Sequence, residues 1–332
     1  MLDRYGRAID YMRISVTDRC NLRCRYCMPD GTVLCGMDEL LTFEEIARAA
    51  KAAASCGIRH VRVTGGEPLV RRSLPVLIRM LKDTPGIEKV TMTTNGTLLK
   101  ANLESLMEAG LDGVNISLDT LDRTQYEQLT GTDALEDVLT SVDAAVDAHL
   151  PVKINAVSLA FPGEHEKEQK ERINALAEFA FVKGADVRFI ELMPVGCGKN
   201  YTGISHTKLR GFLEELWPDI APDTDPHGFG PAVYYRIPGA AGSIGLISAI
   251  SGKFCAFCNR IRLTSKGILR PCLCYDEGED LRTVLRSDLP EEEIDERLRQ
   301  IVTEVIQSKP RSHCFENEQG NGQKDTMNEI GG

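Results

Sequence analysis

The sequence lacks a hydrophobic run long enough to cross a membrane. A spanning helix needs ~18 or more apolar residues in succession. The nearest candidate, 237–250, is interrupted by Pro238, Gly239, Gly242 and Gly245. The first residues, MLDR, do not resemble a signal or transit peptide. We therefore expect a cytosolic chain that does not bind a membrane.

An excess of positive charge is also absent. The 332 residues include 39 Lys and Arg against 49 Asp and Glu, for a formal net charge of −10. This balance argues against a protein that coats nucleic acid, although a local basic pocket remains compatible with it. Apolar residues make up 42% and charged residues 27%, so the chain can form a real core. Its length fits one large barrel or two ordinary domains.

Cysteine, in contrast, is abundant, with 11 residues. Structural disulfides are rare in a reducing compartment, so clustered cysteines indicate metal or redox ligands there. Isolated cysteines such as Cys56 and Cys197 are interpreted as small buried apolar residues. Two tight groups need another explanation. The first group is Cys20, Cys24 and Cys27, and the second group is Cys255, Cys258 and Cys272.

Short β-type runs alternate with helical stretches through the first two thirds of the chain. The expected strands are 11–16, 60–64, 90–94, 113–117, 152–157 and 186–191. The expected helices between them include one that begins with a Thr42–Glu45 capping box and ends at Gly57, and others at 74–82, 102–109, 135–148 and 166–183. Such repeats predict a parallel sheet with right-handed crossovers. The fold class is therefore α/β, an incomplete (β/α)6 TIM-like barrel, with a doubly wound sheet as the alternative.

The predicted strands alternate between apolar and polar residues, whereas parallel strands covered on both faces are usually apolar throughout. Residues such as Met12, Ile14 and Val61 share one parity, and Arg13, Arg62, Thr93, Asn115, Ser117 and Lys153 share the other. Because side chains alternate between faces, the apolar set can meet the helices while the polar set lines the interior. A lumen with several cations would be costly if dry, but it suits a large anionic ligand. The alternative is that these strands are half exposed.

After about residue 195 the strand–helix periodicity fades. The stretch 218–252 is rich in glycine and proline, an acidic helix is expected at 290–308, and a polar tail follows from 317 to 332. We therefore expect two parts. Residues 1–195 would form the partial barrel, and residues 196–332 a smaller element that carries the second cysteine group, closes the barrel mouth and ends in a flexible diglycine tail.

The first cysteine group has the spacing C-x3-C-x2-C, directly after the first expected strand. Iron–sulfur clusters normally take four cysteines, so three ligands leave one iron with an open coordination position. A structural zinc site is the alternative, but it needs four ligands and this loop offers no fourth. The spacing, with Tyr26 immediately before the third cysteine, resembles that of the radical S-adenosylmethionine superfamily. In that family the open iron binds S-adenosylmethionine, and one electron yields a 5′-deoxyadenosyl radical.

A Gly65-Gly66-Glu67 sequence follows the second expected strand. Glycines there allow the backbone to approach a ligand closely. On its own the sequence would be an ordinary turn more often than a site. It resembles the glycine–glycine–glutamate motif with which the same superfamily holds the methionyl ammonium of its cofactor.

The second cysteine group is again a set of three. A zinc ribbon would need a second C-x2-C pair, and the chain offers only Cys272 and Cys274 in a C-x-C. Three cysteine ligands would again leave one iron with an open coordination position, which here could bind a substrate. Cys274 is either a fourth ligand or a bystander, and bystander is the favoured interpretation. Cys35 is a further thiol near the first group.

Longer matches narrow the resemblance to the GTP 3′,8-cyclase family of molybdenum cofactor biosynthesis. The matching stretches include 13–20, 188–196, 254–264, Gly267, 269–273 and 330–332, and the resemblance covers nearly the whole chain. The resemblance implies two [4Fe–4S] clusters, with the second presenting its free iron to the guanine of GTP. It also implies a lyase reaction in which the radical removes the ribose C3′ hydrogen and the C3′ radical then attacks guanine C8.

The same resemblance assigns individual residues. Positions that match cofactor contacts are Tyr26, Gly65, Gly66, Glu67, Ser117 and Met193; positions that match GTP contacts are Arg13, Arg62, Thr93, Lys153, Arg260 and Arg262; and positions expected to take part in catalysis are Arg13, Gly331 and Gly332. Most of the GTP set is cationic, which suits a triphosphate. Each residue alone would more often be a surface charge.

The partners expected from the resemblance are GTP, a flavodoxin or ferredoxin type of electron donor, and cyclic pyranopterin monophosphate synthase as the enzyme that takes the product. The chain would be a monomer or homodimer and would bind no nucleic acid. Two alternatives remain. One is a peptide-maturing radical enzyme with an auxiliary cluster, and the other is a non-catalytic iron–sulfur or zinc sensor.

Overall fold

The fold is built on one large, mostly parallel β-sheet, seen in a computed structural model that describes residues 1–28, 32–315 and 326–331. The strand order is β12-β11-β10-β1-β2-β3-β4-β5-β6-β9-β8-β7. Every pair from β10 to β9 is parallel, and the pairs at both ends are antiparallel. The parallel strands are β1 (Tyr11–Ser15), β2 (His60–Thr64), β3 (Lys89–Thr94), β4 (Val114–Ser117), β5 (Val152–Val157), β6 (Asp186–Ile190), β9 (Ser243–Ile247) and β10 (Arg260–Leu263).

The antiparallel strands are short and lie at the sheet edges. They are β7 (Ala221–Asp223), β8 (Val233–Arg236), β11 (Ile268–Arg270) and β12 (Glu279–Asp280). Strand order is therefore linear, as in an open sheet, and the chain after residue 195 extends both edges of it. The mostly parallel sheet confirms the α/β class and is consistent with a partial barrel, while closure of a barrel mouth by the C-terminal element stays a prediction. The division at residue 195 remains a prediction, because the sheet is continuous across it.

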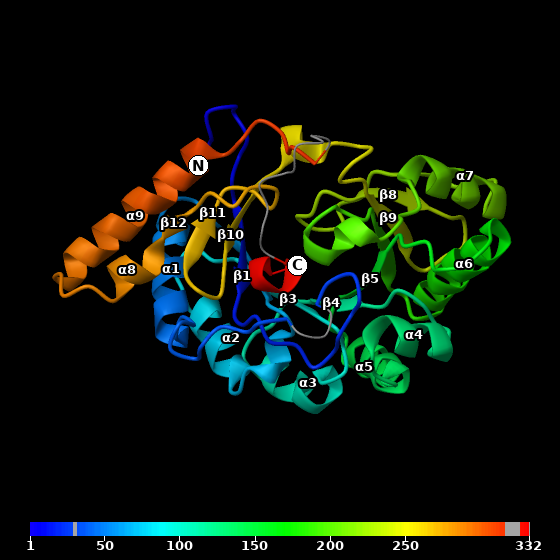
Figure 1. Ribbon diagram of the computed structural model, residues 1–332, viewed down its shortest axis with the longest axis horizontal. Helices are drawn as coiled ribbons and strands as arrows, with labels where there is room; N and C mark the ends of the chain where they lie inside the picture. Colours follow the sequence, from blue (N-terminus) through cyan, green and yellow to red (C-terminus); the bar gives the residue numbers. More distant parts are fainter. Residues whose placement is uncertain (29–31, 316–325, 332) are drawn as a thin grey trace.

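Helices connect the parallel strands and lie along the outer side of the curved sheet (Figure 1). The α-helices are α1 (Phe43–Ser55), α2 (Leu74–Lys82), α3 (Leu99–Glu108), α4 (Arg123–Thr130), α5 (Leu135–Asp147), α6 (Glu166–Val182), α7 (His206–Leu216), α8 (Leu281–Leu285), α9 (Glu291–Ser308) and α10 (Met327–Ile330). Short 3-10 turns are η1 (Pro68–Val70), η2 (Gly196–Asn200) and η3 (Phe254–Phe257). In the ranges that the structure describes, no helix combines the length and apolar character needed to cross a bilayer.

Local sequence explains where α1 begins and ends. The Glu45 N–H donates to Thr42 Oγ1 at 3.2 Å, and the Thr42 N–H donates to Glu45 Oε2 at 2.7 Å, which completes the expected capping box. Beyond the C-cap, Gly57 adopts φ +99°, a left-handed conformation that glycine tolerates. The helix therefore lies between two sequence signals that need no tertiary contact.

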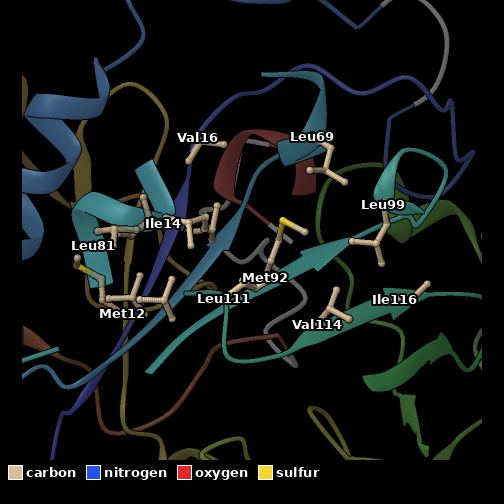
Figure 2. Close-up of a cluster of buried hydrophobic side chains, with 14 of the residues drawn as sticks. Met12, Ile14, Val16, Leu69, Leu81, Met92, Leu99, Leu111, Val114 and Ile116 are labelled. Carbon is tan, nitrogen blue, oxygen red and sulfur yellow. The ribbon is translucent and has the colours of Figure 1, made fainter. Parts of the chain in front are cut away.

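The core lies between the sheet and the helices. Met12, Ile14 and Val16 on β1 and its exit are at most 1% exposed, and the alternate residues of the neighbouring strands are buried with them. Figure 2 shows these side chains with Met92 and Leu81 on the same side of the sheet. The apolar parity thus faces the helices, as the alternation predicted, and the polar parity faces the inner side of the sheet, where the site lies.

Candidate functional site

The first cysteine group occupies the loop that leaves the carboxyl end of β1. The N–H groups of Cys27 and Met28 both donate to the Cys24 carbonyl, at 2.9 and 2.8 Å, and form a tight turn. The loop is held against α4 by two further backbone bonds, from Arg23 to Thr130 and from Arg25 to Leu129, at 2.8 and 3.0 Å. Helix α4 thus fixes the backbone around the cysteines.

The three thiols are suited to binding a cationic cluster. Burial raises the pKa of Cys20 and of Cys24, and it raises the pKa of Cys27 to about 12. Buried thiols of this kind become thiolates when a metal supplies the compensating charge. Among the described residues, no three Cys, His, Asp or Glu side chains are close enough to chelate one ion. Cysteines that bind different irons of one cluster do not need to reach a single ion. Cys20, Cys24 and Cys27 therefore fit a [4Fe–4S] cluster.

The Gly65-Gly66-Glu67 sequence lies directly against the cysteine loop. The Gly66 N–H donates to the Thr17 carbonyl and the Glu67 N–H to the Arg19 carbonyl, both at 2.8 Å. An added Cβ at Gly66 would lie 2.4 Å from the Arg19 oxygen, and one at Gly65 would lie 2.7 Å from the Thr17 oxygen. Only glycine allows this approach, so the motif positions the backbone that leads into Cys20.

The Glu67 side chain is directed into the protein. It is 0% exposed, and its carboxylate accepts hydrogen bonds from the Leu69 N–H, the Thr94 hydroxyl and the Asn95 N–H at 2.7–3.0 Å. Burial raises its pKa to about 7, although these hydrogen bonds lower it. The carboxylate therefore ties the end of β3 to the motif, and a cofactor at this loop would meet backbone groups of the half-buried Gly66.

Tyr26 is oriented by a residue that sequence reasoning missed. Its hydroxyl donates to Asp119 Oδ2 at 2.9 Å, while Asp119 Oδ1 accepts the Val157 N–H at 2.7 Å. Burial raises the pKa of Asp119. The aspartate follows β4 by two residues, just after the predicted cofactor residue Ser117, and only this placement at the carboxyl end of a strand could have signalled it. Met193 lies in the loop after β6, on the same edge of the sheet.

The second cysteine group lies at the opposite end of the strands. Cys255 lies within η3 and Cys258 directly follows it, just before β10, and Cys272 follows the antiparallel β11. Their backbone is fixed by buried cations. Arg7 Nη1 donates to the Cys255 carbonyl at 2.8 Å, and Lys309 Nζ donates to the carbonyls of Arg260 and Pro271, both at 2.7 Å.

These cations also affect the thiols. Burial alone would raise the pKa of Cys258, but Arg260 and Lys309, with hydrogen bonds from Arg260, lower it to about 6. Burial raises the pKa of Cys272. The two cations thus favour the thiolate form of Cys258, which fits an iron–sulfur ligand set. Cys274 is buried beside Cys314 rather than half exposed like the three predicted ligands.

Between the two groups, cationic residues occupy matching positions on adjacent strands. In the parallel register Arg13 of β1 is opposite Arg262 of β10 on one side and Arg62 of β2 on the other. Burial and the neighbouring guanidinium groups lower the pKa of Arg13, and the pKa values of Arg62 and Arg262 fall to about 10 for the same reasons. Such mutual repulsion favours an anionic ligand between them.

Arg188 joins this cluster and was not predicted as a site residue. It is 4% exposed, its Nε donates to the Asn155 side chain at 2.9 Å, and its buried Nη2 has no hydrogen-bond partner among the described residues. It lies opposite Asn155 in the sheet, on the polar parity, so extending the alternation to β6 would have found it.

Two predicted substrate residues lie farther along the sheet. Lys153 of β5 binds the Asp186 carboxylate at 2.5 Å and the Tyr234 hydroxyl at 3.1 Å. Thr93 of β3 accepts a hydrogen bond from Asn115 of β4 at 3.4 Å. Both are half buried on the polar parity, so an anion that reached Lys153 would compete with Asp186.

The C-terminal segment lies on the inner side of the sheet, where it is red in Figure 1. Arg262 Nη1 donates to the Gly331 carbonyl at 3.0 Å, and Asn328 donates to the Asp18 carbonyl at 3.0 Å. An added Cβ at Gly331 would lie 2.6 Å from Thr64 Oγ1. The predicted diglycine thus meets the arginine cluster through Gly331, while Gly332 lies outside the described residues.

The arrangement places two cysteine groups at opposite ends of an arginine-lined face. The first follows the carboxyl end of β1, and the second precedes the amino end of its parallel neighbour β10. Strand β1 has 5 residues, which at ~3.3 Å each separates the groups by about 16 Å along the strands. A molecule the size of a nucleotide can extend over that distance and meet both ends.

Comparison with known proteins agrees with this geometry. Residues 14–176 match the model of the Radical SAM superfamily, and residues 185–315 match Molybdenum Cofactor Synthesis C. GTP 3′,8-cyclases of Clostridium perfringens (strain SM101) and Moorella thermoacetica are 41% and 42% identical to this chain, each over 100% of both chains.

Solved structures show the same fold at lower identity. Streptococcus suis SuiB, in a crystal structure with its precursor peptide SuiA, has a TM-score of 0.62 and 17% identity, covering 91% of this chain and 67% of that one. This likeness shows the fold alone, whereas the full-length relatives show the family. The chain therefore belongs to the GTP 3′,8-cyclase family of radical S-adenosylmethionine enzymes.

Proposed function

We propose that this chain is a lyase that converts GTP to 3′,8-cyclo-7,8-dihydro-GTP, the first step of molybdenum cofactor biosynthesis. One observation supports this most directly. Arg262, Arg13 and Arg62 stand in one row across β10, β1 and β2, between the two cysteine groups. The names of the full-length relatives support the same substrate.

When bound, a [4Fe–4S] cluster on Cys20, Cys24 and Cys27 and S-adenosylmethionine would supply the 5′-deoxyadenosyl radical that removes the C3′ hydrogen. The chain's own residues would position the reactants. Tyr26, held by Asp119, and the Gly66 backbone would orient the cofactor at the carboxyl ends of the strands. Ser117 and Met193 would complete that end of the site.

The arginines would hold the triphosphate. Guanidinium groups bind phosphate oxygens through paired N–H donors and stay charged at neutral pH. Arg13, Arg62 and Arg262 would thereby replace mutual repulsion with contacts to one anion, with Arg260 and Lys153 extending the set and Thr93 adding a hydroxyl. The second cysteine group would then hold the guanine end, so that ribose C3′ and guanine C8 face the cofactor site.

Residues at the inner end of the tail would take part in catalysis. The Gly331 carbonyl already accepts a hydrogen bond from Arg262. With Gly332 it would cover the bound nucleotide and orient Arg13, Arg62 and Arg262 during the reaction. The division into a partial barrel at 1–195 and a cluster-binding element at 196–332 fits these roles. A flavodoxin or ferredoxin type donor and a downstream cyclic pyranopterin monophosphate synthase belong to the same proposal.

Anaerobic incubation of the reconstituted holoenzyme with GTP, S-adenosylmethionine and a reductant tests the activity. We expect loss of GTP and formation of 5′-deoxyadenosine in equal amounts, measured by liquid chromatography and mass spectrometry. Formation of 5′-deoxyadenosine while GTP remains intact would exclude GTP as the substrate. A peptide-maturing enzyme would behave in that way.

A variant with Arg260→Ala and Arg262→Ala tests the division of labour. We expect GTP affinity to fall by at least tenfold, since charge-assisted hydrogen bonds contribute about 1.5–3 kcal/mol each, while reductive cleavage of S-adenosylmethionine continues without substrate. Arg123→Ala is the matched control, because Arg123 is an exposed residue at the start of α4 that pairs with Asp133. Loss of both activities together would contradict the separate roles of the two ends.

A further inference from the structure

Two cysteines outside both predicted ligand sets lie side by side. The sulfur atoms of Cys274 and Cys314 are 3.0 Å apart, although the residues are 40 positions apart in sequence. The Cys314 N–H also donates to Cys274 Sγ at 3.1 Å. Both residues are free thiols in this structure. Each sulfur is thus already directed at the other.

The surrounding backbone holds the pair in place. The Tyr275 hydroxyl donates to the Ser312 carbonyl at 3.3 Å, so the stretches that carry the two cysteines meet at a second point. Cys274 is 0% exposed, whereas Cys314 is half exposed. One thiol is therefore accessible from solvent and the other lies behind it, the arrangement of an attacking and a resolving cysteine.

Another buried cysteine provides a contrast within the same chain. Cys56 is also buried, but its sulfur contacts the Arg299 carbonyl at 3.6 Å and the Thr303 hydroxyl at 3.7 Å. A cysteine that only fills space has partners of that kind. The Cys274 sulfur, in contrast, contacts the thiol of Cys314.

We propose that Cys274 and Cys314 form a redox modification site, which closes to a disulfide by exchange with a low-molecular-weight disulfide such as oxidised glutathione. The Cys314 thiolate attacks one sulfur of that disulfide, and the first thiol leaves. The Cys274 thiol then attacks Cys314, and its proton passes to the second thiol as that thiol is displaced. Two protein S–H bonds are replaced by one S–S bond, and the external disulfide is reduced to two thiols.

The site goes beyond the proposed cyclase activity and does not rest on it. Cys274 follows the predicted cluster ligand Cys272 by two residues, and Cys314 precedes the C-terminal segment that contains Gly331. A bond between them would covalently join the loop of the second cysteine group to the stretch that leads to the tail. Oxidation at this pair would thus act on the substrate end of the site.

Anaerobic holoenzyme equilibrated with graded mixtures of reduced and oxidised glutathione tests the proposal. Peptide mapping by mass spectrometry without reduction should find a Cys274–Cys314 linked peptide that lacks two hydrogens. It should disappear on addition of dithiothreitol. The link should form in the wild type and in Cys56→Ser, the matched control, and be absent from Cys274→Ser and Cys314→Ser. Iron content and the visible absorption of the clusters should be the same before and after.

Any of the following results would overturn the proposal. Absence of the link at every glutathione ratio would do so, as would a glutathione adduct that stays on Cys314 without resolution. A link from Cys314 to Cys272 would assign the chemistry to the cluster ligand. Loss of iron in Cys274→Ser but not in Cys314→Ser would make Cys274 a fourth ligand. The wild-type titration alone decides the question if either variant fails to fold.

Discussion

Replacing Gly66 with alanine should impair cofactor cleavage far more than it impairs folding. The new Cβ would lie 2.4 Å from the Arg19 oxygen and 2.9 Å from the Asp18 oxygen, whereas ordinary contact begins at 3.4 Å. Backbone must therefore move by about 1 Å, the difference between 3.4 and 2.4 Å. The part that moves leads directly into Cys20.

The expected sizes follow from that displacement. Forcing extra volume into a packed site costs about 1–3 kcal/mol of stability, which lowers the melting temperature by several degrees in a chain of this size. A misplacement of about 1 Å at reacting groups can reduce the rate by about 100-fold. Release of 5′-deoxyadenosine should therefore fall by about two orders of magnitude, while most of the chain remains folded at 25 °C.

The assay is anaerobic release of 5′-deoxyadenosine, with iron content and melting temperature measured on the same samples. Gly211→Ala is the matched control, because Gly211 lies inside helix α7 and, beyond the helix's own backbone and chain neighbours, no described atom comes within 4 Å of the added Cβ. That substitution should raise stability by about 0.5–1 kcal/mol and leave the rate unchanged. A Gly66→Ala enzyme with normal iron and a normal rate would refute the steric argument.

Three further predictions concern other parts of the site. Burial raises the pKa of Glu67 to about 7. The contribution of Glu67 to the free energy of unfolding should therefore be full below about pH 4.5 and lost as the pH rises through about 7. Urea titrations should show a loss of at most about 3 kcal/mol over this range, and Glu67→Gln should not show it. Lys309→Met removes a buried ammonium that binds two carbonyls beside the second cysteine group, so iron per chain should fall by about half, whereas the exposed Lys167→Met should change nothing. Asp119→Asn removes the charged acceptor of the Tyr26 hydroxyl, and calorimetry should show S-adenosylmethionine binding weakened by about tenfold; an unchanged affinity would contradict the positioning role of Asp119.

Local signals made the strand–helix order predictable. Strands β2 and β5 and helix α2 have the bounds expected from alternation and from flanking turn residues. The Thr42–Glu45 capping box fixed the start of α1 because both of its hydrogen bonds form within four residues. Helix α4 was missed, since its eight residues carry little apolar periodicity and only the Asp122 cap and Gly131 mark its ends.

The edges of the sheet could not be predicted in the same way. Strand β9 contains Gly245 and lies within a glycine-rich stretch, so its sequence indicated a loop. An added Cβ at Gly245 would lie 2.9 Å from the Arg188 side chain, and the packing that requires glycine there is a tertiary effect. The pairing of β10 with β1 joins residues about 250 positions apart, for which the sequence carries no local signal.

The alternation of side chains along the strands predicted the candidate site better than any single residue did. Arg13, Arg62 and Lys153 shared a face by alternation alone, and β1 and β2 bring two of them opposite one another. The inward direction of the Glu67 carboxylate was not predictable, because the groups that bind it come from the end of β3. Asp119 was missed for the same reason, as its partners Tyr26 and Val157 come from other segments.

The hydrogen bond from Arg262 to the Gly331 carbonyl has a consequence for how the molecule is made. Gly331 is synthesised 69 residues after Arg262, so the arginine face is complete only once both segments have left the ribosome. Added bulk next to Gly331 would enlarge the very segment that lies against Arg262.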